Sequence, residues 1–406
     1  MNTTAHGQYR NCGPGTLSPY KPPASETAFL EVIPSLCVSE RYDSNVYYYP
    51  KAQGVTRNDF VTNVSPTLSV NHNGDYAYGF LNATGFSETY INNPGIDFYG
   101  TSSNLFLDLD KSIKRLIPKA ALRITDVVRY APSAPGYSSL TAGTSPGAPV
   151  NPTNAFAQGF LTQRTNNVTN TATVSASYAI SATTTVEASY SYGILRFGSS
   201  PVAGPTLFDT TTHTVTAGLP VQLTGLDILT PKYTHMEADF SSSVRSGSVQ
   251  SDSATMNWAR TWTQNLKTEL GGGGVIINPG LTTFAANAAL ILSSQKNSAT
   301  ISYVRTAVPN IQGSAVVIIS DIFSLSAVQN LSQQWQLVET ANFAKGFGTN
   351  ITYESLNASV DLNYWWTRIW STALSYDYMH FDSETTGTGR VWARNAITFS
   401  LRATLE

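Results

Sequence analysis

The sequence predicts an all-β protein, specifically a transmembrane antiparallel up-and-down β-barrel of about 18 strands. Three observations lead to this class. Runs of alternating apolar and polar residues recur along the chain, and the connections between them alternate between short and long. Only 12% of the residues are charged, against about 25% in a typical soluble domain. Alternation with a period of two is typical of strands, whose successive side chains point to opposite faces.

The last run, residues 390–405, shows the pattern most clearly. Its odd positions, from Val391 to Leu405, are apolar except for Asn395, and its even positions are mostly polar. Strands in soluble proteins are about 5–6 residues long, whereas a tilted strand needs about 9–11 residues to cross a bilayer. We therefore interpret this run as the strand that closes a membrane barrel, with Asn395 as a polar exception on the apolar face.

The composition argues against other classes of protein. No run approaches the roughly 18 apolar residues that a transmembrane helix needs. Abundant Ser, Thr and Asn, together with 21 Tyr, 17 Phe and 7 Trp, favour a barrel that is apolar outside and polar inside. A disordered chain would lack these aromatic residues. The net charge of −2 gives no indication of a nucleic-acid partner.

The alternating runs give the expected strands and their number. The count is even, as single-chain bacterial barrels require. The expected strands are 33–49, 60–71, 76–90, 98–110, 118–130, 168–180, 186–194, 213–223, 226–240, 248–262, 266–277, 281–294, 298–307, 316–331, 335–344, 352–365, 370–381 and 390–405.

The connections predict how the barrel is oriented. Every second connection is short, as at 72–74, 110–115, 181–184 and 332–334, and longer ones rich in Gly and Pro lie between them, above all 131–165. Short periplasmic turns and long extracellular loops are typical of the bacterial outer membrane, and the parity places both termini in the periplasm. Five tryptophans near the short turns are expected to form an aromatic girdle at the membrane interface: Trp258, Trp262, Trp335, Trp366 and Trp370.

Residues 1–29 show no alternation, so we expect them to form an irregular periplasmic or lumenal segment that could plug the pore. The barrel is expected to comprise residues 30–406. The start has neither the basic nor the apolar region of a signal peptide, and we expect the numbering to begin after signal cleavage or at a start codon placed on the mature sequence. Cys12 and Cys37 are the two cysteines. The periplasm is oxidising, so a Cys12–Cys37 disulfide is predicted to hold this segment inside or across the pore.

Two stretches carry a resemblance to a known family. Residues 33–46 (IPSLCVSERYDSNV) and 58–69 (NDFVTNVSPTLS) resemble the opening of the β-barrel porin type 2 family of Gram-negative bacteria. The resemblance is specific over about the first forty barrel residues and architectural afterwards. Members of that family are often associated with exopolysaccharide systems. The resemblance therefore implies an outer-membrane exit for an exopolysaccharide or another polar polymer. The chain departs from common outer-membrane barrels in ending Leu405-Glu406 rather than with an aromatic residue.

Most lumen-facing positions are Ser, Thr or Asn, and nine charged residues are scattered among them. They either form a constriction that selects ions, as charged rings do in channels, or pair with one another and stay solvated. The nine are Asp108, Asp110, Lys119, Arg123, Arg129, Asp361, Asp377, Arg394 and Arg402.

No enzyme, metal or cofactor is expected. The histidines at positions 6, 72, 213, 235 and 380 are dispersed, and His380 near Asp377 and Asp382 is the best catalytic candidate. No ligand spacing and no C-x-x-C-H haem motif is present. Besides polymer export, two functions stay open: passive diffusion of small solutes, and a non-transporting barrel that anchors a surface structure or sheathes a separate cytochrome. Expected partners are outer-membrane lipid and lipopolysaccharide, and possible further ones are periplasmic polysaccharide-export proteins or a surface assembly.

Overall fold

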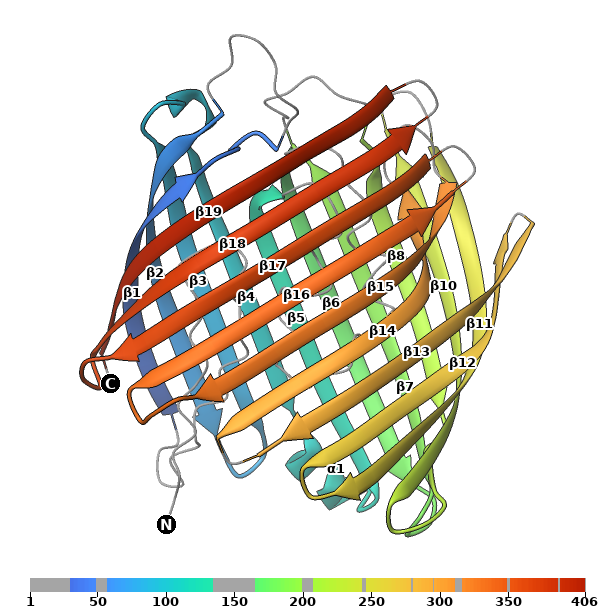
Figure 1. Cartoon of the computed structure of the whole chain (residues 1–406). Coiled ribbons are helices and arrows are strands. Elements are labelled where there is room, and N and C mark those ends of the chain that lie inside the picture. Colours follow the sequence, from blue (N-terminus) through green and yellow to red (C-terminus); the bar gives the residue numbers. More distant parts are fainter. Residues whose placement is uncertain are drawn as a thin grey trace.

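The computed structural model is one antiparallel sheet that closes on itself (Figure 1). It describes residues 30–48, 57–133, 165–198, 207–242, 246–278, 280–294, 296–310, 316–348, 351–385 and 388–405. The sheet of the described residues has 19 strands. Strands β8 and β9 both pair with β10, one after the other along its length, so they count as one interrupted strand of an 18-stranded barrel. The last strand pairs with the first, Ser35 opposite Thr404, which closes the barrel as predicted.

The strands follow the expected runs within a few residues. Their bounds are β1 Leu30–Asp43, β2 Asp59–Asn73, β3 Tyr78–Tyr90, β4 Phe98–Asp108, β5 Ala120–Ser133, β6 Thr165–Ala179, β7 Thr185–Phe197, β8 Asp209–Gly218, β9 Val221–Gln222, β10 Asp227–Ser241, β11 Ser246–Thr263, β12 Leu266–Asn278, β13 Leu281–Ser293, β14 Asn297–Asn310, β15 Val316–Asn330, β16 Trp335–Phe347, β17 Ile351–Trp365, β18 Trp370–Thr385 and β19 Thr388–Thr404.

Three local features depart from the pattern of regular strands joined by short turns. Pro220 lies between β8 and β9, and because proline has no backbone N–H, it cannot donate to the ladder there. Residues 110–115, expected as a short turn, form instead the helix α1, Asp110–Leu116, between β4 and β5. A short 3₁₀ turn, η1, covers Pro94–Ile96. No helix in the described ranges is long and apolar enough to cross a membrane.

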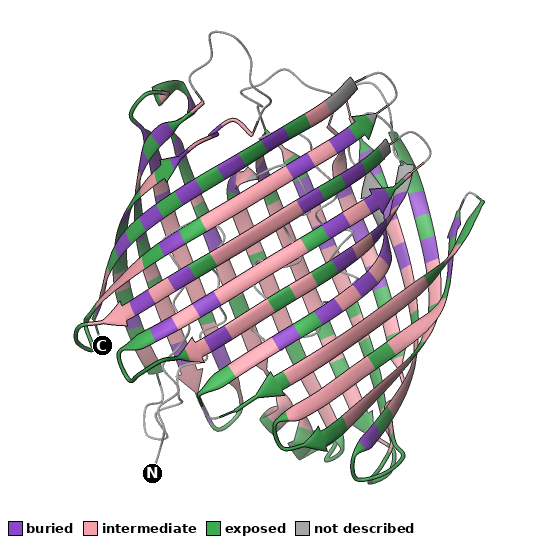
Figure 2. Cartoon of the chain, in the orientation of Figure 1, coloured by how far each residue is buried: buried purple, intermediate pink, exposed green. Residues whose placement is uncertain are grey.

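The alternation predicted for the last strand is present side chain by side chain. From 391 to 401, every odd residue of β19 is exposed on the outer face, and the even residues from 392 to 400 are buried toward the interior. Figure 2 shows this as alternating stripes along β19. Leu401 is 42% exposed and Phe399 is 55% exposed, although both are apolar. An apolar outer face of this kind is suited to lipid.

The two ends of the barrel differ, and we call them the short-turn end and the loop end. At the short-turn end, the connections other than the α1 segment are a few residues long, such as 180–184 and 264–265. The two longest connections, 44–58 and 134–164, both lie at the loop end, as predicted. Five connections at the loop end are also short, among them 279–280 and 386–387, because two residues are enough to join antiparallel strands at either end.

The interior is sorted along the barrel axis. Near the middle, hydroxyls from neighbouring strands bond to one another, as between Thr173 and Ser191 at 2.7 Å and between Thr340 and Ser359 at 2.7 Å. Toward the loop end, two groups of inward side chains are apolar and buried, one on β15–β19 and one on β7–β14. The sequence predicted the polar positions but not these apolar ones.

Candidate functional site: a charged network in the lumen

A multidentate ion pair in the lumen joins the two strands that close the barrel. Arg394 on β19 donates from Nε to both carboxylate oxygens of Asp43 on β1, at 2.9 Å each, and from Nη2 to Oδ2 at 2.7 Å. The side chains are 8% and 1% exposed. Such multidentate charge-assisted bonds are the strong ones, and they fix both groups in place. The arginine thus holds a charged position on the wall, with the guanidinium 5.2 Å from the Tyr48 ring.

The network continues across β2 to β3. Arg41 lies 3.5 Å from Asp43 and donates to Glu88 at 3.2 Å. In the register, Arg41 pairs with Val61, which in turn pairs with Tyr90. The arginine therefore reaches over a whole strand to meet its partner. Glu88 also accepts a bond from the Tyr90 hydroxyl at 2.6 Å. Two arginines and two carboxylates thereby alternate along one side of the lumen.

The segment that follows β1 folds over this network. Asn45 is fully buried, and its backbone N–H donates to Asp43 at 3.0 Å. Val46 packs with Tyr90 and others, and Tyr48 lies edge-on to Trp392 at 5.5 Å. Tyr48 has a φ of 53°, a left-handed conformation that costs a non-glycine residue roughly 1–2 kcal/mol. Residues 44–48 are thus packed onto the lumen wall rather than extended away from it.

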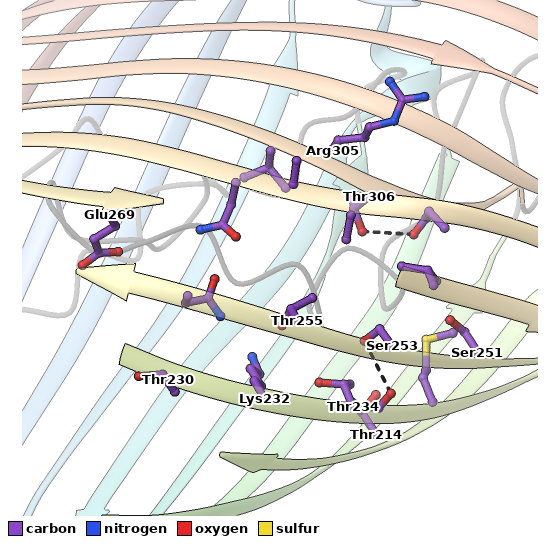
Figure 3. A pocket seen from close by; sticks show the side chains of 18 of the residues that line it. Thr214, Thr230, Lys232, Thr234, Ser251, Ser253, Thr255, Glu269, Arg305 and Thr306 are labelled. Carbon is purple, nitrogen blue, oxygen red and sulfur yellow. Dashed lines mark hydrogen bonds between the residues drawn. The ribbon is translucent and has the colours of Figure 1, made fainter. Parts of the chain in front are cut away.

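The lumen wall on the side opposite the charged network is lined mainly by hydroxyl and amide groups. Strand β11 lies opposite β1 in the ring of strands, and a cavity of about 530 Å³ is lined there by β8 and β10–β14. Figure 3 shows hydroxyls of Thr230, Thr234, Ser253 and Thr255 gathered around it, with Lys232 among them. Gly271 leaves room for the amide oxygens of Asn257 and Asn287, which a Cβ at this position would displace. The lumen therefore has a charged side and a hydroxyl and amide side.

The predicted charged residues fall into two groups. At the short-turn end, Arg123 lies 3.3 Å from Asp108 and 3.6 Å from Asp110. Asp110 belongs to α1 rather than to a strand, and Lys119 precedes β5 and is exposed. Both lie at the mouth rather than on the barrel wall, because the chain leaves the sheet between β4 and β5.

The remaining five occupy inward positions on the wall. Asp361 is 5% exposed on β17, and Arg394 is part of the network. Arg129, Asp377 and Arg402 share the inward parity of their strands, β5, β18 and β19. Their role in ion selection stays a prediction. Three members of the network were not predicted, although their inward parity on the expected strands was a usable signal: Arg41, Asp43 and Glu88.

The predicted disulfide falls partly outside the described residues. Cys37 is 4% exposed on the inward face of β1, as expected. Cys12 and the whole segment 1–29 lie outside the described residues. Their pairing and the plug therefore stay predictions.

All five predicted girdle tryptophans lie near the short-turn end on outward parity. Trp262, Trp335, Trp366 and Trp370 are 49%, 40%, 62% and 47% exposed. Trp258 is half-buried and donates to Asp227 at 3.1 Å. Indoles prefer the membrane interface, and this placement is compatible with the predicted girdle.

A second outward row, near the middle of the strands and on the loop-end side of the tryptophans, was not predicted. Four times, a tyrosine hydroxyl contacts a polar group on the next strand, two residues nearer the loop end. The tyrosines, with their partners, are Tyr190 with His213 at 2.8 Å, Tyr233 with Asp252 at 2.5 Å, Tyr303 with Asp321 at 2.7 Å and Tyr376 with Asn395 at 2.7 Å. Tyrosine rings lie in apolar surroundings while their hydroxyls reach a wet boundary. The row is compatible with a second interface level.

The catalytic and metal candidates gain no support from the geometry. His380 lies on the outward parity of β18, opposite the inward Asp377, so these two side chains do not meet through the wall. Within the described ranges, no three His, Cys, Asp or Glu side chains come together as a metal site.

The closed ring, the apolar outer face and the polar lumen define the chain as a β-barrel of the outer-membrane type. Neither a protein-family model nor a curated protein matches the sequence, so the resemblance at 33–46 and 58–69 stays a prediction. Among solved structures, the chain is similar to OccK3 (OpdO) of Pseudomonas aeruginosa, with 12% identity, coverage of 93% of this chain and 96% of that one, and a TM-score of 0.46.

Two further structures show a similar degree of likeness. For OccAB4 of Acinetobacter baumannii, the identity is 8%, the coverage 92% and 98%, and the TM-score 0.44. For the siderophore receptor PirA of Pseudomonas aeruginosa, the identity is 7%, the coverage is 93% of this chain and 80% of that one, and the TM-score is 0.45. Similarity at this level identifies neither the family nor the cargo.

Proposed function

We propose that the chain is a porin-like channel through which small polar solutes diffuse, with the charged network on β1, β3 and β19 setting its selectivity. The observation that carries the proposal is the fixed pairing of Arg394 with Asp43 and of Arg41 with Glu88 on the lumen wall. Barrels of about 16–18 strands leave room for an aqueous channel. Charged groups held on the wall of such a channel discriminate among ions and polar solutes.

Several features favour small solutes over a bulky polymer. Residues 44–48 pack inward onto the wall. Together with the apolar clusters at the loop end, they take up part of the space that water and solutes could otherwise occupy. The network contains two positive and two negative side chains. A balanced set of this kind gives weak ion selectivity, which a single substitution shifts in a predictable direction.

Export of an exopolysaccharide or another polar polymer is the second candidate. The hydroxyl and amide side of the lumen favours it, because Thr255, Asn257 and Asn287 line one continuous cavity and offer hydrogen bonds to sugar hydroxyls. Under this proposal, periplasmic export proteins would be the partners at the short-turn end. Lipid and lipopolysaccharide are the proposed partners of the outer face, with the short-turn end in the periplasm.

The reversal potential across a planar bilayer under a salt gradient tests the selectivity. Arg394→Gln removes a lumenal positive charge and is expected to shift the reversal potential toward cations, and Asp43→Asn is expected to shift it toward anions. Lys345→Gln is the matched control, because Lys345 lies on the outward parity of β16 and pairs with Glu354. If both lumenal variants keep the wild-type value, the network does not set selectivity.

Liposome swelling separates the two candidates. A diffusion channel admits monosaccharides and disaccharides and excludes long oligosaccharides, so swelling is expected to fall steeply with sugar length. Swelling that persists with long oligosaccharides would instead support the polymer conduit. No swelling with any sugar would contradict both.

A further inference from the structure

The wall of the barrel is incomplete between β13 and β14 near the loop end. Hydrogen-bonded pairing joins these strands only from Ser293 opposite Ser298 to Ala286 opposite Arg305. Both strands continue beyond this row. Residues 281–285 remain paired with β12, and residues 306–310 remain paired with β15. Five residues on each strand therefore have a ladder partner on the far side only, which leaves a seam that runs from the Ala286–Arg305 row to the loop end.

The lumenal cavity reaches this seam. Its lining includes three consecutive residues of β13, from Ala285 to Asn287, and four of β14, from Val304 to Ala307. Consecutive residues of a strand point to opposite faces, so the lining includes positions of both faces along the seam. Its volume of about 530 Å³ lies in the range of roughly 300–1,000 Å³ that is usual for ligand sites.

The cavity changes character with distance from the seam. Beside the seam its lining is mostly apolar, with Ala285, Val304 and Ala307 next to the hydroxyl of Thr306, and Val275 and Met236 lie beyond. Farther toward the short-turn end it is lined by Ser, Thr and Asn, as Figure 3 shows. This gradient matches a molecule with an apolar tail and a polar head.

The outer mouth of the seam lies at the level of the tyrosine row. Arg305 donates to Asp321 at 2.9 Å, beside the Tyr303 hydroxyl, and its guanidinium lies 4.4 Å over the ring of Phe284, which is 56% exposed. Unpaired backbone groups cost several kcal/mol each in lipid. The ladder thus stops where the apolar part of the membrane is expected to stop, and the mouth faces the head groups of the leaflet at the loop end.

We propose that this seam is a lateral portal, through which a single-chain amphiphile passes between the lumen and the leaflet at the loop end. The tail would lie along Ala285, Val304 and Val275, and the polar head would meet the hydroxyls of the cavity. In the orientation predicted from the loop lengths, this is the outer leaflet. The portal is independent of the charged network, which lies on the other side of the lumen.

Photolabelling in liposomes tests the portal. The probe is a fatty acid with a photoactivatable group near the end of its tail, and mass spectrometry locates the labelled residues. Labels are expected on Met236 and Val275, which are buried inward positions that lipid does not reach across a closed wall. Outward Leu292 is the positive control for contact with lipid. Labels confined to outward residues would overturn the proposal.

Two variants that close the seam sharpen the test. A cysteine pair, Ala285→Cys with Thr306→Cys, would join facing positions, and Ala307→Trp would fill the gap without oxidation. Either is expected to abolish labelling of Met236 and Val275, and reductant is expected to restore it in the first variant. Thr340→Cys with Ser359→Cys, across a fully paired ladder, is the matched control. Inward labelling that survives closure would show that the probe enters through the open ends of the barrel.

Discussion

The hydroxyl of Tyr376 donates to Oδ1 of Asn395 at 2.7 Å, on the outer face of the barrel. Asn395 is the one polar residue in the apolar set of the last strand, and this bond explains it. The tyrosine lies two residues nearer the middle of the barrel than the row of Asn395, which pairs with Tyr378. The ring can therefore lie against lipid tails while its hydroxyl reaches the polar boundary.

This pair is expected to contribute measurably to stability. Tyr376→Phe and Asn395→Ala should show a coupling of about 1 kcal/mol in a double-mutant cycle, because each removes the same hydrogen bond. The measurement is reversible urea unfolding of the barrel in vesicles. Tyr178→Phe, at another outward tyrosine near the short-turn end, is the control. Additive effects of the two changes would contradict the assignment.

Breaking the pair of Arg394 and Asp43 is expected to be costly. With side chains 8% and 1% exposed, removal of one partner from such a pair destabilises a protein by about 3–5 kcal/mol. In Arg394→Met, Arg41 still lies 3.5 Å from Asp43 and partly compensates its buried negative charge. The loss of stability should therefore be near the lower end of this range, about 3 kcal/mol. Asp43→Leu with Arg394→Met should recover much of the loss, because no unpaired charge remains buried. A double variant less stable than Arg394→Met alone would argue against this explanation.

Any side chain at Gly346 is expected to destabilise the barrel. It pairs with Tyr353, and a Cβ on Gly346 would overlap the Tyr353 ring. That ring is 2% exposed, and its hydroxyl lies 2.8 Å from Ser320. Gly346→Ala should therefore lower the free energy of unfolding by about 1–3 kcal/mol, as overpacking does. The matched control is Gly274→Ala, because a Cβ there meets nothing within 4 Å.

The barrel could be predicted from the sequence because its strands are long and nearly regular. Each expected run became a strand, and the last strand kept its two faces from Val391 to Leu401. The helix α1 was missed, although Asp110 at its start and Lys114 and Arg115 at its end suit a helix dipole. A segment of 7 residues between two strands gives too little periodicity to separate a helix from a turn.

The site was harder to predict, because its contacts depend on register. The partner of Arg394 is 351 residues away in the chain and meets it only because β19 closes on β1. The buried apolar residues of the lumen, such as Phe381 and Trp392, contradict the simple rule that apolar residues face lipid. The short ladder between β13 and β14 has no sequence signal that we can identify, since both strands continue past its end.

Single-channel conductance in a planar bilayer, with and without reductant, tests the central claim most directly. We expect steady conductance whose reversal potential moves toward cations in Arg394→Gln, because the proposed channel is water-filled and the network lies on its lumenal wall. Conductance that appears only on reduction would support the predicted Cys12–Cys37 plug. Silence of the folded barrel under both conditions, with and without residues 1–29, would contradict the channel.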